Sequence, residues 1–183
     1  TILAGLCFTC INRTKPNQIE SLLPGYVQFG QYDSKLSEHS NEMISAFEQA
    51  GNQVKRAESL DEVLWRKLCW NIPFNGLAIA CGGVTTDRIL SDPRHRSRAR
   101  RLMDEIQDAA LSHGIKIEDS FLVKQFDLTE PMGPYKPSSL IDFLKGRSVE
   151  VEAIWGEPLR RGKSKGLQMT ELQKLYEELC TLT

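Results

Sequence analysis

One segment, residues 59–80, constrains the fold more than any other part of the sequence. It reads SLDEVLWRKLCWNIPFNGLAIA, and from Leu68 to Ala80 every residue is apolar, glycine or proline except two asparagines. Ser59 and Glu62 form the capping-box pattern that begins a helix. No apolar run in the chain approaches the ~18 residues of a membrane-spanning helix, so this segment predicts a long helix that is buried inside a folded domain.

Three polar residues, Lys67, Asn71 and Asn75, recur every four positions and form one stripe along this helix. Burying an unpaired amide or ammonium group costs several kcal/mol, so the stripe needs partners. Two interpretations stay open: an internal hydrogen-bond network, or a cleft in which these groups face a polar ligand. Lys67 favours the cleft, because lysine is almost never fully buried without a partner or a chemical role. Pro73 removes one helical N–H beside the stripe and can bend the helix there.

The chain divides into two unequal parts. Residues 1–33 read as strands with turns at Lys15-Pro16-Asn17 and Pro24-Gly25, and a helix over roughly 37–50 ends at Gly51. The inner face of that helix is predicted to carry Met43, Ile44, Phe47 and Ala50. This part resembles the tail of an α/β domain, too short to form a full parallel sheet by itself.

From Ser59 onward the pattern is helical. Asp92 and Pro93 supply a helix start, and Gly114 supplies the stop. The apolar face between them is predicted to be Ala99, Leu102, Met103, Ile106, Ala109 and Ala110. Further helices are expected near residues 120–127, 138–146, 150–161 and 170–181.

Several function classes are disfavoured. Lys plus Arg number 23 against 24 Asp plus Glu, which gives no general reason to expect nucleic acid or an anionic membrane as partner. The arginine-rich run 94–101 is followed one turn later by Asp104, Glu105 and Asp108, so it is interpreted as a solvated, ion-paired face. No GxGxxG occurs, and Gly156 to Gly162 is one residue too long for a phosphate-binding P-loop.

Cysteine and histidine point to no metal site. The five cysteines are an odd number in a core-rich sequence, which favours a reducing, cytoplasmic compartment. Cys7 and Cys10 form a lone CxxC without the second pair that a zinc site needs. The chain opens with TILAGLCFTCI and lacks the basic start of a signal peptide, so we expect it to be part of a longer protein.

Two further features carry a functional and an ordinary interpretation. Ser138 and Ser139 follow Pro137. A serine at the start of a helix is typical of an N-cap. The alternative is an anion site for a carboxylate, made of the serine hydroxyls and the free backbone N–H groups at the helix start. Glu150 is either a first-turn carboxylate that favours the helix dipole or a functional acid.

Taken together, the order and spacing of these features are similar to those of the ketopantoate reductase family. The resemblance covers nearly the whole chain and includes the Asp92-Pro93 helix that ends at Gly114. The residues that carry it are Trp65-Arg66-Lys67-Leu68-x-x-Asn71-x-x-x-Asn75, then Ser138-Ser139-Leu140-x-Asp142-x-x-x-Gly146-Arg147-x-x-Glu150, then Ile154-x-Gly156.

The resemblance implies a mostly α fold. Residues 1–57 would be the remnant of a Rossmann NADP-binding domain, and residues 58–183 an all-helical C-terminal domain of the 6-phosphogluconate-dehydrogenase-like type. The Gly-rich nucleotide motif would lie upstream of Thr1. The implied activity is NADPH-dependent reduction of 2-dehydropantoate to (R)-pantoate, on the route to pantothenate and coenzyme A. The resemblance further implies a cytoplasmic enzyme that can form a homodimer. The 183 residues alone are expected to be inactive.

The resemblance also implies residue roles. Lys67 matches the catalytic lysine, which donates a proton to the keto oxygen while hydride arrives at its carbon. Asn71 and Asn75 match substrate-binding asparagines. Ser138 or Ser139 would hold the substrate carboxylate, and Glu150 would lie near the substrate and the nicotinamide ribose.

Two departures from the family pattern leave the substrate open. The distance from the serine pair to Asp142 is one residue shorter than the commonest form, so which serine contacts the ligand stays undecided. Thr85 stands where relatives often have another substrate-binding asparagine. A related reductase of a different 2-oxo acid is therefore one alternative. The other is a non-catalytic helical module that dimerises or binds a protein partner.

Overall fold

The structure is a computed structural model that describes residues 2–21, 25–32 and 35–183. The chain splits into two compact units, Thr1–Leu64 and Trp65–Thr183. Of the predicted Pro24-Gly25 turn, Pro24 lies outside the described residues.

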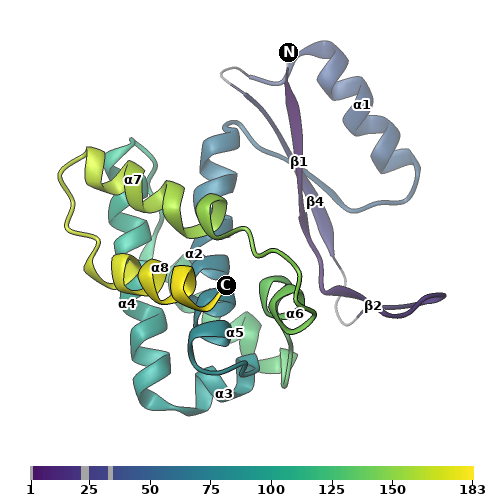
Figure 1. The fold of residues 1–183 in the computed structure, drawn as a ribbon. Helices are drawn as coiled ribbons and strands as arrows, with labels where there is room; N and C mark the ends of the chain where they lie inside the picture. The colour runs from purple at the N-terminus through teal and green to yellow at the C-terminus, as the bar shows by residue number, and fades with distance from the viewer. Residues whose placement is uncertain (1, 22–24, 33–34) are drawn as a thin grey trace. The chain divides into compact units, whose positions relative to one another are not determined.

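Figure 1 labels most of the strands and helices. In chain order they are β1 (Leu3–Phe8), β2 (Ile11–Lys15), β3 (Gln18–Ser21), β4 (Tyr26–Gln31), α1 (Glu38–Gln49), β5 (Val54–Arg56), α2 (Leu60–Ala80), α3 (Thr86–Ser91), α4 (Pro93–Ser112), α5 (Asp119–Thr129), a 3-10 turn (Glu130–Met132), α6 (Ser138–Leu144), a π-helical turn (Glu152–Gly156), α7 (Glu157–Ser164) and α8 (Thr170–Leu182).

The first unit contains a three-stranded sheet in the order β1-β4-β5. β1 runs antiparallel to β4, whereas β5 runs parallel to β4 and is reached through α1. A parallel neighbour reached through a helix is the β–α–β arrangement of α/β folds. β2 and β3 form a separate antiparallel pair whose turn contains the predicted Pro16 and Asn17.

The prediction for the inner face of α1 is only partly right. Ile44 is fully buried, but Met43 is 58% exposed and Phe47 is 43% exposed. Phe47 still touches the sheet, through an edge contact with Phe29 at 5.1 Å between ring centroids. Adjacent residues on a helix point about 100° apart. Ile44 is therefore enclosed, whereas Phe47 lies at the margin of the contact between α1 and the sheet.

From Trp65 onward, where α2 belongs to the second unit, this helix is buried as the sequence predicts. Cys69, Ile72, Phe74 and Leu77 each expose 0% of their surface. Ser59 begins the helix by accepting a hydrogen bond from the backbone N–H of Glu62 (3.3 Å). Helices that follow later in the chain contact α2 on several sides, which explains why so little of its surface is polar.

The second long helix, α4, also follows the prediction. Asp92 caps it by accepting a hydrogen bond from the N–H of Arg94 (2.8 Å), and all six predicted core residues are buried. Glu105 of α4 accepts hydrogen bonds from the N–H groups of Glu171 and Leu172, both 2.8 Å, and so caps the start of α8. The residue before α8, Met169, has a left-handed backbone (φ +50°).

The mostly α fold class is confirmed. Local features that were not predicted include strand β5, the short helix α3, the 3-10 turn Glu130–Met132, and the π-helical turn inside the expected helix over 150–161. Within the part of the chain that the structure describes, no helix is long and apolar enough to cross a membrane.

Candidate functional site

The predicted polar stripe exists on α2. Lys67, Asn71 and Asn75 all lie within this one helix, and Pro73 is inside it between the two asparagines. Lys67 and Asn71 are half-buried, whereas Asn75 is only 1% exposed. Four residues of helix advance ~6 Å, so the three side chains begin at evenly spaced points along one face. Along the stripe, the side chains therefore change from half-buried at Lys67 and Asn71 to fully buried at Asn75.

Asn75 is held by the start of α6. Its side-chain Oδ1 accepts a hydrogen bond of 2.9 Å from the backbone N–H of Ser139, and Ser139 is itself only 5% exposed. The residue at the N-cap position of α6 is Pro137, which makes no side-chain cap bond. The interpretation of Ser138 as the N-cap is thus wrong, because an asparagine from a distant helix supplies the acceptor instead.

The two serines of this pair differ in solvent exposure. Ser138 is the first residue of α6 and is exposed, while Ser139 is buried beside Asn75. The structure therefore brings together Asn75 and Ser139 from the predicted set, with the Ser138 hydroxyl one residue away. A ligand held at this helix start would meet the Ser138 side chain before the Ser139 side chain.

Glu150 is exposed and stands immediately before the helical segment that starts at Val151. Its carbonyl oxygen accepts a hydrogen bond from the N–H of Ile154 (3.0 Å). Glu150 therefore stands at the start of this helical segment and not in its first turn, and its side chain is exposed.

Sequence reasoning missed two residues that fix this region. The indole N–H of Trp155, in the π-helical turn, donates a 3.0 Å hydrogen bond to the carbonyl oxygen of Ile72 in α2. Gly76 lies one turn further along α2, and a Cβ added there would stand 2.8 Å from the Trp155 Nε1. A glycine within an apolar helical pattern is the signal that could have revealed this close approach.

The thiol of Cys69 is not a reactive group of this site. Burial raises the pKa of Cys69 to about 12, so the thiol is protonated at neutral pH.

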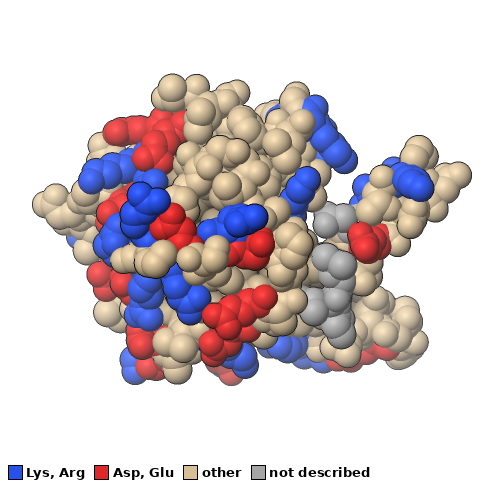
Figure 2. Space-filling view, turned by 90° about the horizontal axis from the view of Figure 1, so that it is seen from below, with Lys and Arg blue, Asp and Glu red and all other residues tan. Residues whose placement is uncertain are grey.

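The arginine-rich start of α4 is an ion-paired surface, as predicted, but most of its partners differ from those predicted. Arg98 pairs with Glu178 (3.0 Å) and Arg101 with Glu171 (3.0 Å), both on α8. Arg100 pairs within the helix, with Asp104 (2.8 Å). Figure 2 shows basic and acidic side chains interspersed on the face that it presents. This charge pattern ties helices together and leaves no continuous basic footprint there.

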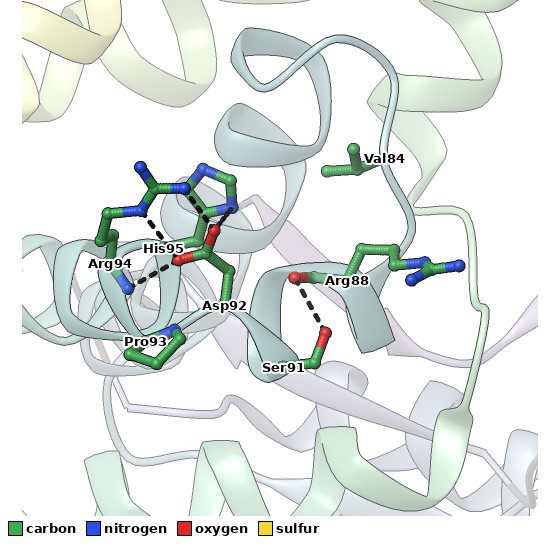
Figure 3. A pocket seen from close by; sticks show the side chains of 7 residues that line it. All are labelled: Val84, Arg88, Ser91, Asp92, Pro93, Arg94 and His95. Atoms are coloured by element: carbon green, nitrogen blue, oxygen red, sulfur yellow. Dashed lines mark hydrogen bonds and ion pairs between the residues drawn. The ribbon is translucent and has the colours of Figure 1, made fainter.

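An open hollow of about 740 Å³ lies at the junction of α3 and α4 (Figure 3). Its lining residues are Val84, Arg88, Ser91, Asp92, Pro93, Arg94 and His95. None of the predicted site residues belongs to this set. The Asp92 carboxylate is occupied by Arg94, which binds it at 2.9 Å while Asp92 also caps the helix. We therefore assign the hollow no role in the candidate site.

The Asp92 cap predicts a pH dependence of stability. Hydrogen bonds from the Arg94 side chain and backbone hold the pKa of Asp92 well below its ordinary value. A lowered folded-state pKa means that the carboxylate stabilises the fold above its unfolded-state pKa of about 3.9, and that this contribution is lost as pH falls through the folded-state pKa. The difference in Tm between the wild type and Asp92→Asn should be largest near about pH 6 and should narrow toward about pH 2. An equal difference at both ends would contradict the assignment.

Comparison with known proteins gives a consistent result. The family model described as "Ketopantoate reductase PanE/ApbA C terminal" matches residues 59–182. A 2-dehydropantoate 2-reductase of Nostoc sp. is 34% identical over 97% of this chain and 57% of its own length. The crystal structure of 2-dehydropantoate 2-reductase from Geobacter metallireducens superposes with a TM-score of 0.92 at 32% identity, over 99% of this chain and 60% of that one.

More distant structures share the fold alone. D-mandelate dehydrogenase, solved with NADH and anilino(oxo)acetate, superposes with a TM-score of 0.87 at 17% identity. A dimeric ketopantoate reductase from Staphylococcus aureus does so with a TM-score of 0.80, also at 17% identity. This chain spans a little over half the length of the Nostoc relative.

Proposed function

The chain belongs to the ketopantoate reductase family, and we propose that it is the C-terminal part of an NADPH-dependent reductase that converts 2-dehydropantoate to (R)-pantoate. The observation that carries the proposal is the polar face of α2, where half-buried Lys67 and Asn71 precede an Asn75 that is bound to the start of α6. Such a face joins a cation to fixed hydrogen-bonding groups within an apolar helix, as the reduction of a charged keto acid requires.

The reaction needs a proton donor and a site for a carboxylate. A reduced nicotinamide, when bound, supplies the hydride that reaches the keto carbon. Lys67 donates a hydrogen bond to the keto oxygen, stabilises the negative charge that develops there, and transfers a proton to it. Asn71 and Asn75 orient the substrate, and the Ser138 hydroxyl with the Ser139 region binds its carboxylate.

The chain contains no GxGxxG, so we assign the main nucleotide-binding motif to a part of the protein outside residues 1–183. The residues present fit a contribution from one side: the exposed carboxylate of Glu150 can accept hydrogen bonds from ribose hydroxyls. We further propose that residues 1–57 are the end of the Rossmann domain, that the 183 residues alone are inactive, and that the whole enzyme is cytoplasmic and can form a homodimer.

The test is NADPH and NADH oxidation, followed by absorbance, in the full-length protein with ketopantoate and a panel of other 2-oxo acids. We expect turnover with ketopantoate and a preference for NADPH. Turnover with another acid alone would keep the mechanism and replace the substrate. A folded protein that binds NADPH but reduces none of the acids would instead support a helical interaction module.

A further inference from the structure

The segment that carries Glu150 is tied to α2 at both ends. It begins after α6, whose start is fixed by the Ser139 N–H bond to Asn75, and it ends at the π-helical turn, where Trp155 binds Ile72. The two acceptors, Ile72 and Asn75, are three residues apart and so lie within one turn of α2. This single turn of α2 therefore anchors Ser139 and Trp155, the two residues between which the Glu150 segment runs.

The Trp155 anchor is built for close contact. Trp155 is 0% exposed, and its indole approaches α2 next to Gly76, where a Cβ would stand 2.8 Å from the Nε1. A carbonyl oxygen has two lone pairs, so Ile72 can accept the indole N–H as well as its helical partner. A hydrogen bond enclosed in this way is shielded from competition by water.

The π-helical turn contains Trp155 and follows Glu150 closely along the chain. The turn spans Glu152–Gly156 and directs Trp155 and Gly156 into the core, while Glu152 binds Arg160 at the surface (2.7 Å). π-helical turns are rare and occur frequently at functional sites. Glu150 lies five residues before Trp155 and its carbonyl is the first acceptor of the same helical segment. The indole anchor and Glu150 therefore belong to one continuous helical segment.

From this arrangement we infer that Trp155 is a positioning residue: its indole N–H bond to Ile72 holds Glu150 in register with the Lys67–Asn71–Asn75 face. The inference rests on the proposed function, because it gives Glu150 a task at the reacting end of the substrate and nicotinamide. Trp155 itself is buried against α2 and acts through Glu150.

The test compares two tryptophan-to-phenylalanine variants of the full-length protein. Trp155→Phe removes the bond to Ile72 and keeps an aromatic ring in the core. Trp70→Phe is the matched control, since it removes an indole N–H bond of 2.8 Å to the Thr129 hydroxyl, within the same unit but away from the Glu150 segment. We expect kcat for the 2-oxo acid to fall about tenfold in Trp155→Phe and less than about twofold in Trp70→Phe, a difference equivalent to one strong hydrogen bond.

The same substitution made in a Glu150→Gln variant tests whether Trp155 acts through Glu150. In Glu150→Gln, adding Trp155→Phe should lower kcat by less than about twofold, because residues that act as a unit are not additive. Amide hydrogen exchange of residues 145–151 should accelerate in Trp155→Phe and not in Trp70→Phe.

The outcomes separate the two proposals. If the wild type reduces a 2-oxo acid but Trp155→Phe equals Trp70→Phe, or lowers kcat equally in both backgrounds, the inference is wrong and the proposed function stands. If the wild type reduces none, the proposed function fails and the inference is overturned with it.

Discussion

Replacing Lys67 with alanine is expected to lower kcat/KM for the 2-oxo acid by about 10³-fold. The side chain is half-buried on α2, one helical turn from Asn71, and the proposed mechanism places it at the keto oxygen. In the proposed mechanism, its removal takes away both the proton and the positive charge that stabilise the developing alkoxide, and positioned acid catalysis contributes about 10²–10⁴-fold. The measurement is steady-state NADPH oxidation with the acid that the wild type reduces.

Two control variants make this result specific. Lys174→Ala removes an exposed lysine of α8 and should leave kcat/KM unchanged. Lys67→Arg keeps the charge but places a planar group of very high pKa at the reacting oxygen, so it should restore only a small part of the rate. A Lys67→Ala enzyme with wild-type turnover would remove Lys67 from the mechanism, whatever its effect on stability.

The long helices were predictable from the sequence because their signals are local. The capping serine of α2, the Asp92-Pro93 start of α4 and the apolar spacing of α4 each depend on residues within a few turns. The six-residue helix α3 was missed because it precedes Asp92 directly and its N-cap, Thr85, makes no cap bond to the backbone. Nothing in that short stretch separates it from the stronger start signal of α4.

The polar stripe on α2 was predictable as one face of a helix, but its contacts were not. The four-residue spacing placed Lys67, Asn71 and Asn75 on one face, and the structure agrees. The partner of Asn75 lies 64 residues away, and the Trp155–Ile72 bond spans 83 residues. No periodicity within one helix encodes such pairs. The need for a partner could be argued from the cost of burying an amide, whereas its identity required the fold.

Gly76→Ala should destabilise the helical unit, Trp65–Thr183. The opposite would be expected in an isolated helix, where alanine is more favourable than glycine by about 1 kcal/mol. The added Cβ would lie 2.6 Å from Cδ2 of Leu175 and 2.8 Å from Nε1 of Trp155. Neither atom can retreat easily, because Leu175 is 0% exposed and the Trp155 indole is held by Ile72. Overpacking of this kind costs about 1–3 kcal/mol. The gain in helix propensity offsets about 1 kcal/mol of this cost, so we expect the free energy of unfolding to fall by about 1 kcal/mol.

The sign of this change is the test, because helix propensity and packing predict opposite results. Urea unfolding of the 183-residue chain followed by tryptophan fluorescence suits the purpose, since all three tryptophans, Trp65, Trp70 and Trp155, lie in the helical unit. In a double-mutant cycle, Leu175→Ala should open space for the new methyl group, so the double variant should be more stable than the sum of the two single losses by about 1 kcal/mol. A stabilising Gly76→Ala, or strict additivity with Leu175→Ala, would mean that α2 and α8 do not approach as closely as the Gly76 backbone indicates.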